Sequence, residues 1–299
     1  MNQAKHIIFI TGQNGLLGKQ LTKSLTDQYL VVGLTRNTEF PEKPSWNYRE
    51  TLKQLNIKAP DTVIHLAGAG IADKRWNKQH KQIIFNSRIN GTQWLVDEIL
   101  SHEDKPKTFV SASAIGFYGH RPGESLTENA TAGNNFVADI AKHWELASDP
   151  LMAVNTRVIK LRFGMILSKN GGALKDMLLP FKMCLGGRLG NGKQQYSWIS
   201  ITDVIKAIQF LLPQDNSEGV YNLTSPHPVS NQTFTKTLAK VLKRPAFMHM
   251  PAFMVRLIFG QMADELLLAD AHVLPDRLLA EGFEFNHPSL PAALEALLQ

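Results

Sequence analysis

Three glycines in the sequence TGQNGLLG, from Thr11 to Gly18, have the spacing of a phosphate-binding turn. Gly12 permits a sharp turn, Gly15 lets the backbone approach a pyrophosphate, and Gly18 lets a following helix pack closely on a sheet. The N-terminus of that helix favours an anion, because it offers free N–H groups and the positive end of the helix dipole. The alternative is a glycine-rich turn without a ligand. The predicted dinucleotide ligands are Gly12, Asn14, Gly15, Leu16, Leu17 and Gly18.

The residues after the second predicted strand distinguish NAD from NADP. A carboxylate there would bind the ribose 2′-hydroxyl of NAD, but this chain has Thr35, Arg36 and Asn37. The guanidinium of Arg36 suits a 2′-phosphate because it presents a planar fork of donors. We therefore predict NADP(H) as the cofactor. The alternative is that Arg36 is a solvated loop cation.

These residues need a sheet to position them, and the hydrophobic pattern predicts one. Short apolar runs alternate with stretches of helical spacing, which is typical of an α/β protein with a Rossmann-like, doubly wound parallel sheet. Helices are expected up to about Thr26, along the stretch from Ile84 to Ile99, and near residues 135–148. Strands are predicted at residues 6–11, 30–35, 61–67, 108–113 and 156–162.

Beyond residue 165 the pattern is less regular. It indicates a helix within 171–192, a helix at 201–212 capped by Ser200 or Thr202, a strand at 219–224 and a helix from about Ser230 to Leu242. We therefore predict an NADP(H)-binding domain at residues 1–165, to which 201–225 returns, followed by a smaller α/β substrate region and a helical appendage. The last two occupy residues 166–248 and 249–299.

Composition excludes several other classes of protein. The 299 residues contain one cysteine, Cys184, so an intramolecular disulfide framework and a zinc site with two thiolates are excluded. The net charge of +6 favours an anionic partner, but the basic residues are scattered, so we do not expect nucleic-acid binding. No apolar run approaches the roughly 18 residues of a membrane span. We predict a cytoplasmic protein that binds a small-molecule substrate and no metal.

Several further sequences carry a family resemblance. HLAG (65–68) and SASAIGFYG (111–119), together with the glycine turn, resemble the extended short-chain dehydrogenases, which include nucleotide-sugar epimerases and dehydratases. IADKRW (71–76), SRINGT (87–92), the Trp144-Glu145 pair, GGRLGNGKQQYSWISITD (186–203) and VLPDRLLAEGFEF (273–285) resemble an atypical epimerase-family subgroup with a small C-terminal domain of unknown function. The resemblance extends from about residue 6 to residue 298.

The resemblance implies roles for individual residues. Leu66, Ala67 and Gly68 would line the adenosine and ribose side of the cofactor. The turn that begins with Arg162 would pass near the nicotinamide, which makes Arg162 a predicted cofactor-binding residue, and Asp203 would belong to a motif that closes the substrate cleft. The alternatives are a buried strand end for HLAG and an acid that complements a helix dipole for Asp203.

The catalytic pair of the extended dehydrogenases is missing. In those enzymes a tyrosine moves a proton, and a lysine four residues later lowers the pKa of its phenol. None of the five tyrosines here has that lysine; in the corresponding helix Phe136 and Ile140 take the two positions, and Lys142 is out of register by about half a turn. Ser113 aligns with the catalytic serine or threonine of the family.

Tyr118 and His120 are the remaining candidates for proton transfer. Tyr118 would be a substitute acid if its hydroxyl faces the nicotinamide, although it could also only pack against the cleft, and His120 is more easily explained as a solvated histidine. The predicted catalytic residues are therefore Ser113 and Tyr118. A further group of cations and tryptophans could form a wall for an anionic or planar substrate. The alternative is that the tryptophans belong to the core and the cations face solvent. The residues are Arg75, Trp76, Arg88, Lys193, Gln194 and Trp198.

Two functions remain open from the sequence. The first is an NADP(H)-binding, epimerase-like oxidoreductase that acts on an unidentified anionic small molecule. The second is a non-catalytic protein that binds NADP(H) and senses it, which the missing tyrosine and lysine favour.

Overall fold

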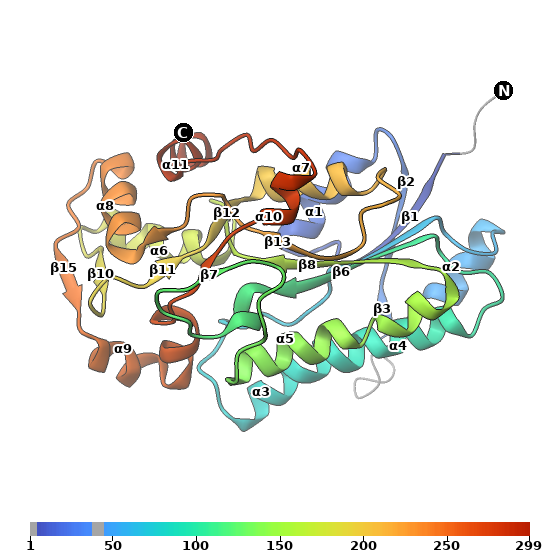
Figure 1. Cartoon of the computed structure of the whole chain (residues 1–299), viewed down its shortest axis with the longest axis horizontal. Helices are drawn as coiled ribbons and strands as arrows, with labels where there is room; N and C mark the ends of the chain where they lie inside the picture. Colours follow the sequence, from blue (N-terminus) through green and yellow to red (C-terminus); the bar gives the residue numbers. More distant parts are fainter. Residues whose placement is uncertain (1–4, 38–44) are drawn as a thin grey trace.

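A six-stranded parallel sheet forms the centre of the computed structural model, which describes residues 5–37 and 45–299 (Figure 1). Its order is β13-β8-β6-β5-β1-β2, so the chain leaves β1 in one direction toward β2 and in the other toward β5. This reversal is the topological switch point at which doubly wound sheets bind their ligands. The strands are β1 (Ile7–Thr11), β2 (Leu30–Leu34), β5 (Thr62–His65), β6 (Thr108–Ala114), β8 (Arg157–Phe163) and β13 (Gly219–Leu223).

Helices cover both faces of the sheet, which explains why its strands are apolar throughout. Ile8 and Ile10 of β1 pack in one core with α1 (Leu16–Leu25) and α7 (Ile201–Leu211). Phe9 points to the opposite face and packs with α2 (Tyr48–Leu55) and α4 (Gly91–Leu100). The predicted Rossmann-like fold and its predicted strands are therefore confirmed.

The stretch from Ile84 to Ile99 is not one regular helix. It consists of α3 (Lys78–Phe85), a π-helical segment (Asn86–Asn90) and α4. A second π-helical segment (Ala263–Leu267) follows α9 (Ala252–Phe259). Single π turns often occur at functional sites, and both segments contribute to the cavity described below. The helix expected near 135–148 is α5 (Phe136–Leu146).

Short strand pairs and helices extend the fold beyond the large sheet. Trp198 and Phe234 lie in a separate core between α6 (Gly172–Lys182), α8 (Asn231–Leu242) and α11 (Leu290–Leu298). The pairs are β9 (Met165–Leu167) with β12 (Trp198–Ser200), β10 (Gly187–Leu189) with β15 (Met248–Met250), β11 (Gln195–Tyr196) with β14 (Val229–Ser230), β7 (Ser125–Leu126) with β16 (His272–Val273), and β3 (Arg36–Asn37) with β4 (Ser45–Trp46).

Asp203 attaches the C-terminal segment to the sheet domain. Ser200 caps α7, as predicted, by accepting the N–H of Asp203 at 3.0 Å. The buried carboxylate of Asp203 accepts the backbone N–H groups of Asn286 at 2.7 Å and His287 at 3.1 Å. These bonds hold the chain between α10 (Asp276–Ala280) and α11 against α7. The predicted domain boundaries stay predictions.

Within the described residues, no helix is long and apolar enough to cross a membrane. The same residues contain no group of three or more histidine, cysteine, aspartate or glutamate side chains placed to hold a metal ion.

Candidate nucleotide and substrate site

The glycine turn is built as a nucleotide-binding turn requires. Gly12 has φ +71°, a conformation that residues with a Cβ rarely adopt, and a Cβ there would lie 2.9 Å from the carbonyl carbon of Leu66. A Cβ on Gly18 would lie 2.1 Å from the carbonyl oxygen of Gly12. Both glycines are therefore needed for the turn to close, although Gly18 approaches the turn itself rather than the sheet.

The N-terminus of α1 has no side-chain cap. Gly15 is the N-cap residue, and both Asn14 and Gly15 are exposed. The N–H of Gly15 donates to Gly12 O at 2.9 Å, so it is not one of the free N–H groups expected at this helix N-terminus. The backbone N–H groups of Leu16 and Leu17, at the start of the helix, remain as the expected donors to a phosphate. This arrangement fits a pyrophosphate group.

The end of β5 lies against the same turn. Thr11 Oγ1 accepts the N–H of Ala67 at 3.3 Å and contacts His65 Nδ1 at 2.8 Å. Because burial lowers the pKa of His65 to about 4, its imidazole is neutral at physiological pH. Leu66, Ala67 and Gly68 follow directly, so the turn and the HLAG sequence form one surface at the switch point.

Arg36 lies at the same edge of the sheet. It begins β3 two residues after β2 ends, and its side chain is exposed. Because β2 is parallel to and paired with β1, both strands end at the edge where the glycine turn begins. This is the position from which a cation would reach an adenosine 2′-phosphate.

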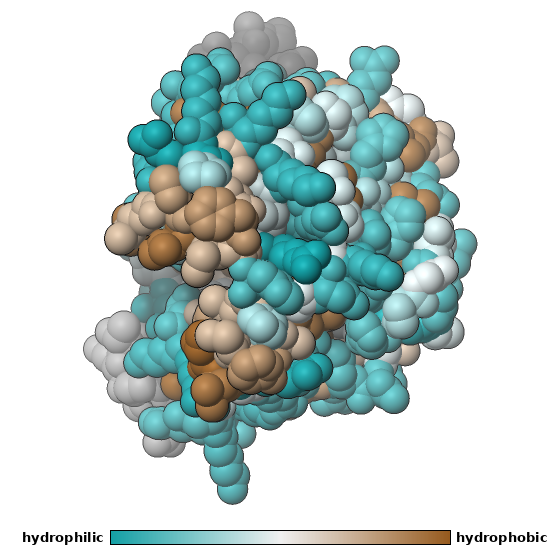
Figure 2. All heavy atoms as spheres, turned by 90° about the vertical axis from the view of Figure 1, so that its left-hand side faces the viewer, coloured by the Kyte–Doolittle hydropathy of each residue, from teal (hydrophilic) through white to brown (hydrophobic). Residues whose placement is uncertain are grey.

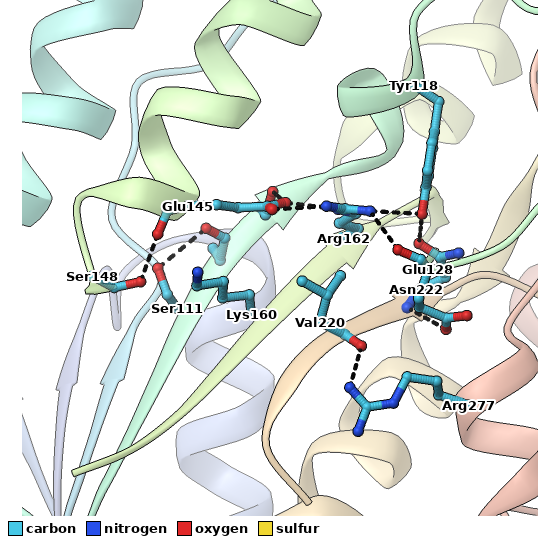
Figure 3. A network of polar contacts seen from close by, with 12 residues as sticks. Ser111, Tyr118, Glu128, Glu145, Ser148, Lys160, Arg162, Val220, Asn222 and Arg277 are labelled. Carbon is cyan, nitrogen blue, oxygen red and sulfur yellow. Dashed lines mark hydrogen bonds and ion pairs between the residues drawn. The ribbon is translucent and has the colours of Figure 1, made fainter. Parts of the chain in front are cut away.

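Tyr118 lies in a buried polar network with Arg162 and Glu145 (Figure 3), and Ser113 joins it through Glu145. Ser113 donates to Glu145 Oε1 at 2.6 Å, and Arg162 binds both carboxylate oxygens of Glu145, at 2.7 and 2.8 Å. Arg162 also donates to the Tyr118 hydroxyl at 2.9 Å, which in turn donates to Asn222 Oδ1 at 2.7 Å. The network joins β6, α5, β8 and β13 at the carboxyl edge of the sheet.

Burial and charge oppose each other in this network. Burial raises the pKa of Tyr118, although the adjacent Arg162 charge acts in the other direction. Burial disfavours the charge of Arg162, but the hydrogen bonds and charge of Glu145 outweigh it and raise the pKa of Arg162. Burial also raises the pKa of Glu128, which accepts the N–H of Asn222. Because its pKa is raised, the phenol of Tyr118 is protonated at neutral pH.

The network lies behind the wall of a large cavity. The cavity has a volume of about 1310 Å³, and Ala114 and Phe163, at the ends of β6 and β8, line it. Ser113 and Tyr118 are only 2% and 0% exposed and are not among its lining residues. The guanidinium of Arg162 is directed into the network. Whether Ser113, Tyr118 and Arg162 reach a substrate or cofactor stays a prediction.

The helix that would carry the tyrosine and lysine presents an apolar face to the cavity. Val137, Ile140, Ala141 and Trp144 of α5 line it, so an isoleucine occupies the expected lysine position. Lys142 is exposed and lies outside the lining. His120 is exposed as well, and its ring accepts the N–H of Asp270 at 2.9 Å.

Of the two alternatives for the group that contains Trp76 and Trp198, the structure supports core tryptophans and surface cations rather than a substrate wall, apart from Arg88. Trp76 and Trp198 are buried in different cores and donate to the backbone oxygens of Ile71 and His227. Arg75 and Lys193 are exposed and do not line the cavity, and Gln194 binds backbone oxygens. Only Arg88 of this group lines it. Residue type alone therefore does not predict which aromatic and cationic side chains are buried in the core and which line the cavity.

Sequence reasoning missed other parts of the site. The sequence marks Glu145 only as part of a family motif, and it carries no signal for Glu128 or Asn222. The cavity also has a methionine-rich wall, formed by residues scattered from 165 to 262. The one available signal was the Trp144-Glu145 pair, whose members face the cavity and the network respectively.

The sheet, the glycine turn and the cavity at the switch point define a dinucleotide-binding α/β protein of the Rossmann-like class. Residues 8–224 match the NAD dependent epimerase/dehydratase family, and residues 250–297 match a domain of unknown function, DUF1731. The chain belongs to the NAD dependent epimerase/dehydratase family. The resemblance noted in the sequence is thereby confirmed.

Two of the similar proteins match this chain over nearly their whole length, and a third matches over part of its length. An epimerase family protein of Staphylococcus haemolyticus is 38% identical over 294 residues, which are 97% of this chain and 98% of the relative. The crystal structure of the human epimerase family protein SDR39U1 (isoform 2) with NADPH is 29% identical, with a TM-score of 0.86 and coverage of 97% and 98% of the two chains. A nucleoside-diphosphate sugar epimerase from Corynebacterium glutamicum is 30% identical, with a TM-score of 0.76; the match covers 99% of this chain and 58% of that one.

Proposed function

We propose that this protein is an NADP(H)-dependent oxidoreductase of the epimerase-like class. The observation that carries the proposal is the adjacency of the glycine turn to the cavity. A Cβ on Gly171, which lines the cavity, would lie 3.2 Å from the side chain of Leu16 in that turn. A dinucleotide bound at α1 would extend from the turn toward the cavity, and its nicotinamide would supply a hydride there.

NADP(H) is proposed over NAD(H) because Arg36 stands where a carboxylate would bind the NAD ribose. The NADPH in the human relative supports the same choice. The proposed cofactor ligands are the residues of the turn, Arg36, the surface at Leu66, Ala67 and Gly68, and the backbone that follows Arg162.

The substrate is proposed to be an anionic small molecule, and the cation that supports this is Arg88 in the cavity wall. Ser113 and Tyr118 are proposed to act in proton transfer from behind that wall. The chain of hydrogen bonds from Ser113 through Glu145 and Arg162 to Tyr118 supports this role, because it fixes where each proton is held. A cytoplasmic location is proposed on the single cysteine alone.

Non-catalytic binding of NADP(H) is the second candidate function. The observation that favours it is Ile140, because an apolar side chain at the lysine position cannot lower the pKa of a phenol. It predicts that the cofactor changes the affinity for a partner without being oxidised.

Hydride transfer distinguishes the two functions. The protein is incubated with NADPH deuterated at C4 and with a small-molecule extract, and products that gain deuterium are sought by mass spectrometry. An oxidoreductase transfers the label, and Tyr118→Phe slows the transfer while NADPH still binds. Tight NADPH binding without any labelled product would favour the second function.

A further inference from the structure

The cavity wall is unusually rich in methionine. Methionine side chains are unbranched and polarizable, so they adapt to apolar ligands of irregular shape. At about 1310 Å³ the cavity is larger than the roughly 300–1,000 Å³ of an ordinary small-molecule pocket, which leaves room for a substrate beside a nicotinamide. The six methionines that line it are Met165, Met177, Met248, Met250, Met254 and Met262.

Aromatic side chains complete this apolar wall. A sugar nucleotide would bury hydroxyl groups against these surfaces, and buried hydroxyls without hydrogen-bond partners are costly. The composition of the wall therefore favours a ligand whose body is mostly hydrocarbon or aromatic. The aromatic residues are Trp144, Phe163, Phe181, Tyr196, Phe234 and Phe259.

Charged side chains in the lining are mostly at the surface. Asp73, Lys175, Asp176 and His249 are exposed. Glu265 is half-buried, but its carboxylate already accepts the N–H of Val137 and the side-chain amide of Gln261. The Glu265 carboxylate therefore already has hydrogen-bond partners within the protein.

Arg88 differs from these groups. It lies in the π-helical segment Asn86–Asn90, and its guanidinium stands 5.1 Å from the ring centroid of Trp144. Burial lowers the pKa of Arg88 to about 10, so it stays charged at neutral pH. Among the described residues it forms no ion pair, and the one hydrogen bond of its side chain, to Ile84 O, is long at 3.5 Å. Most of its five N–H donors are free for a ligand.

The outer end of the cavity continues into an exposed apolar surface. Leu185, Met248 and Met254 line the cavity and are also exposed. Phe247 and Leu257, which are 76% and 73% exposed, lie nearby in the sequence, and Figure 2 shows apolar side chains gathered on this side of the molecule. A ligand with an apolar body would therefore meet apolar contacts from the interior to the mouth.

We infer that the cavity binds a molecule with one anionic group and a predominantly apolar body. Arg88 binds the anionic group, and the methionine and aromatic wall contacts the body. This inference rests on the proposed function, of which it names the substrate class.

Two fluorescent probes of nearly the same shape test this inference. 1-Anilinonaphthalene-8-sulfonate has an apolar aromatic body and one sulfonate, and N-phenyl-1-naphthylamine has the same rings without the charge. Each is titrated into the protein saturated with NADP⁺, which does not fluoresce. The sulfonate is expected to bind about tenfold more tightly than the neutral probe, because a charge-assisted hydrogen bond to the buried guanidinium is stronger than a neutral contact. Arg88→Gln should remove that difference.

Variants at the mouth locate the probes. Met254→Glu places a charge in the lining at a residue that is 40% exposed, so it should weaken both probes about fivefold or more without unfolding the protein. Met152→Glu is the matched control, because Met152 is 51% exposed and lies outside the cavity lining, and it should change neither affinity. Thermal unfolding of each variant checks that it is folded.

Several outcomes would overturn the inference. Equal affinities for both probes that do not change in Arg88→Gln would show that the cavity does not recognise an anionic group. Probe affinities that do not change in Met254→Glu would show that the probes bind elsewhere on the surface. Weaker binding of NADP⁺ rather than of the sulfonate in Arg88→Gln would make Arg88 a cofactor ligand. A separate NADP⁺ titration keeps the two proposals apart, because failure to bind NADP⁺ contradicts the proposed function whatever the probes do.

Discussion

The guanidinium of Arg162 and the carboxylate of Glu145 form a buried bidentate ion pair, with N–O distances of 2.7 and 2.8 Å. The two side chains are 4% and 7% exposed. Glu145 also accepts the hydroxyl of Ser113, so its charge holds together the polar network behind the cavity.

Removal of the Glu145 charge should destabilise the protein. Glu145→Gln leaves the Arg162 guanidinium buried without a counter-charge, which costs about 3–5 kcal/mol of the free energy of unfolding. Urea denaturation measures this loss. Glu124→Gln is the control, because Glu124 forms an exposed ion pair with Arg121 and should leave the midpoint unchanged. Equal midpoints for both variants would show that the buried pair contributes nothing to stability.

Gly18→Ala should abolish tight nucleotide binding. The new Cβ would lie 2.1 Å from Gly12 O, so the turn must open and its N–H groups must leave the phosphate. We expect NADPH to bind about tenfold or more weakly, as measured by fluorescence titration. Gly91→Ala, at a helical glycine whose Cβ would meet only Asn86 O at 3.7 Å, should bind NADPH normally. Normal binding by Gly18→Ala would place the cofactor elsewhere.

Burial of neutral His65 should make stability depend on pH. Its pKa is about 4 when folded and 6.5 when exposed, so between these values the unfolded state binds the extra proton and stability falls as pH falls. The expected loss is about 2 kcal/mol between pH 7 and pH 5. Urea denaturation of His65→Gln at pH 7 and at pH 5 should show a smaller pH dependence than that of the original protein. An unchanged pH dependence in His65→Gln would refute this assignment.

Asp203→Ala should loosen the C-terminal segment. It removes the carboxylate that accepts two backbone N–H groups, at Asn286 and His287, and a hydrogen bond to a charged group contributes about 1.5–3 kcal/mol. Hydrogen exchange in a peptide that covers residues 284–290 should accelerate. Asp97→Ala, at an exposed position in α4, is the control. Protection of that peptide at the original level would show that other contacts hold the segment.

The sheet and the glycine turn were predictable because their signals are local. Apolar runs of strand length alternate with helical spacing, and glycine readily adopts the φ of +71° at residue 12, which residues with a Cβ rarely do. The buried network was not predictable, because Tyr118 and Asn222 lie 104 residues apart and meet only through the strand order of the sheet. The methionine wall was not predictable either, because its residues are scattered from 165 to 262 and meet only in the folded chain. No periodicity signals the π turn that carries Arg88.

The affinities for NADPH and NADH, measured on the original protein and on Arg36→Gln, test whether Arg36 binds the 2′-phosphate of an NADP(H) cofactor. NADPH should bind about tenfold or more tightly than NADH, because Arg36 binds the 2′-phosphate. Arg36→Gln should weaken NADPH to the level of NADH and change NADH by less than about twofold. Equal binding of both nucleotides by the original protein, or an equal loss for both in the variant, would contradict this role of Arg36.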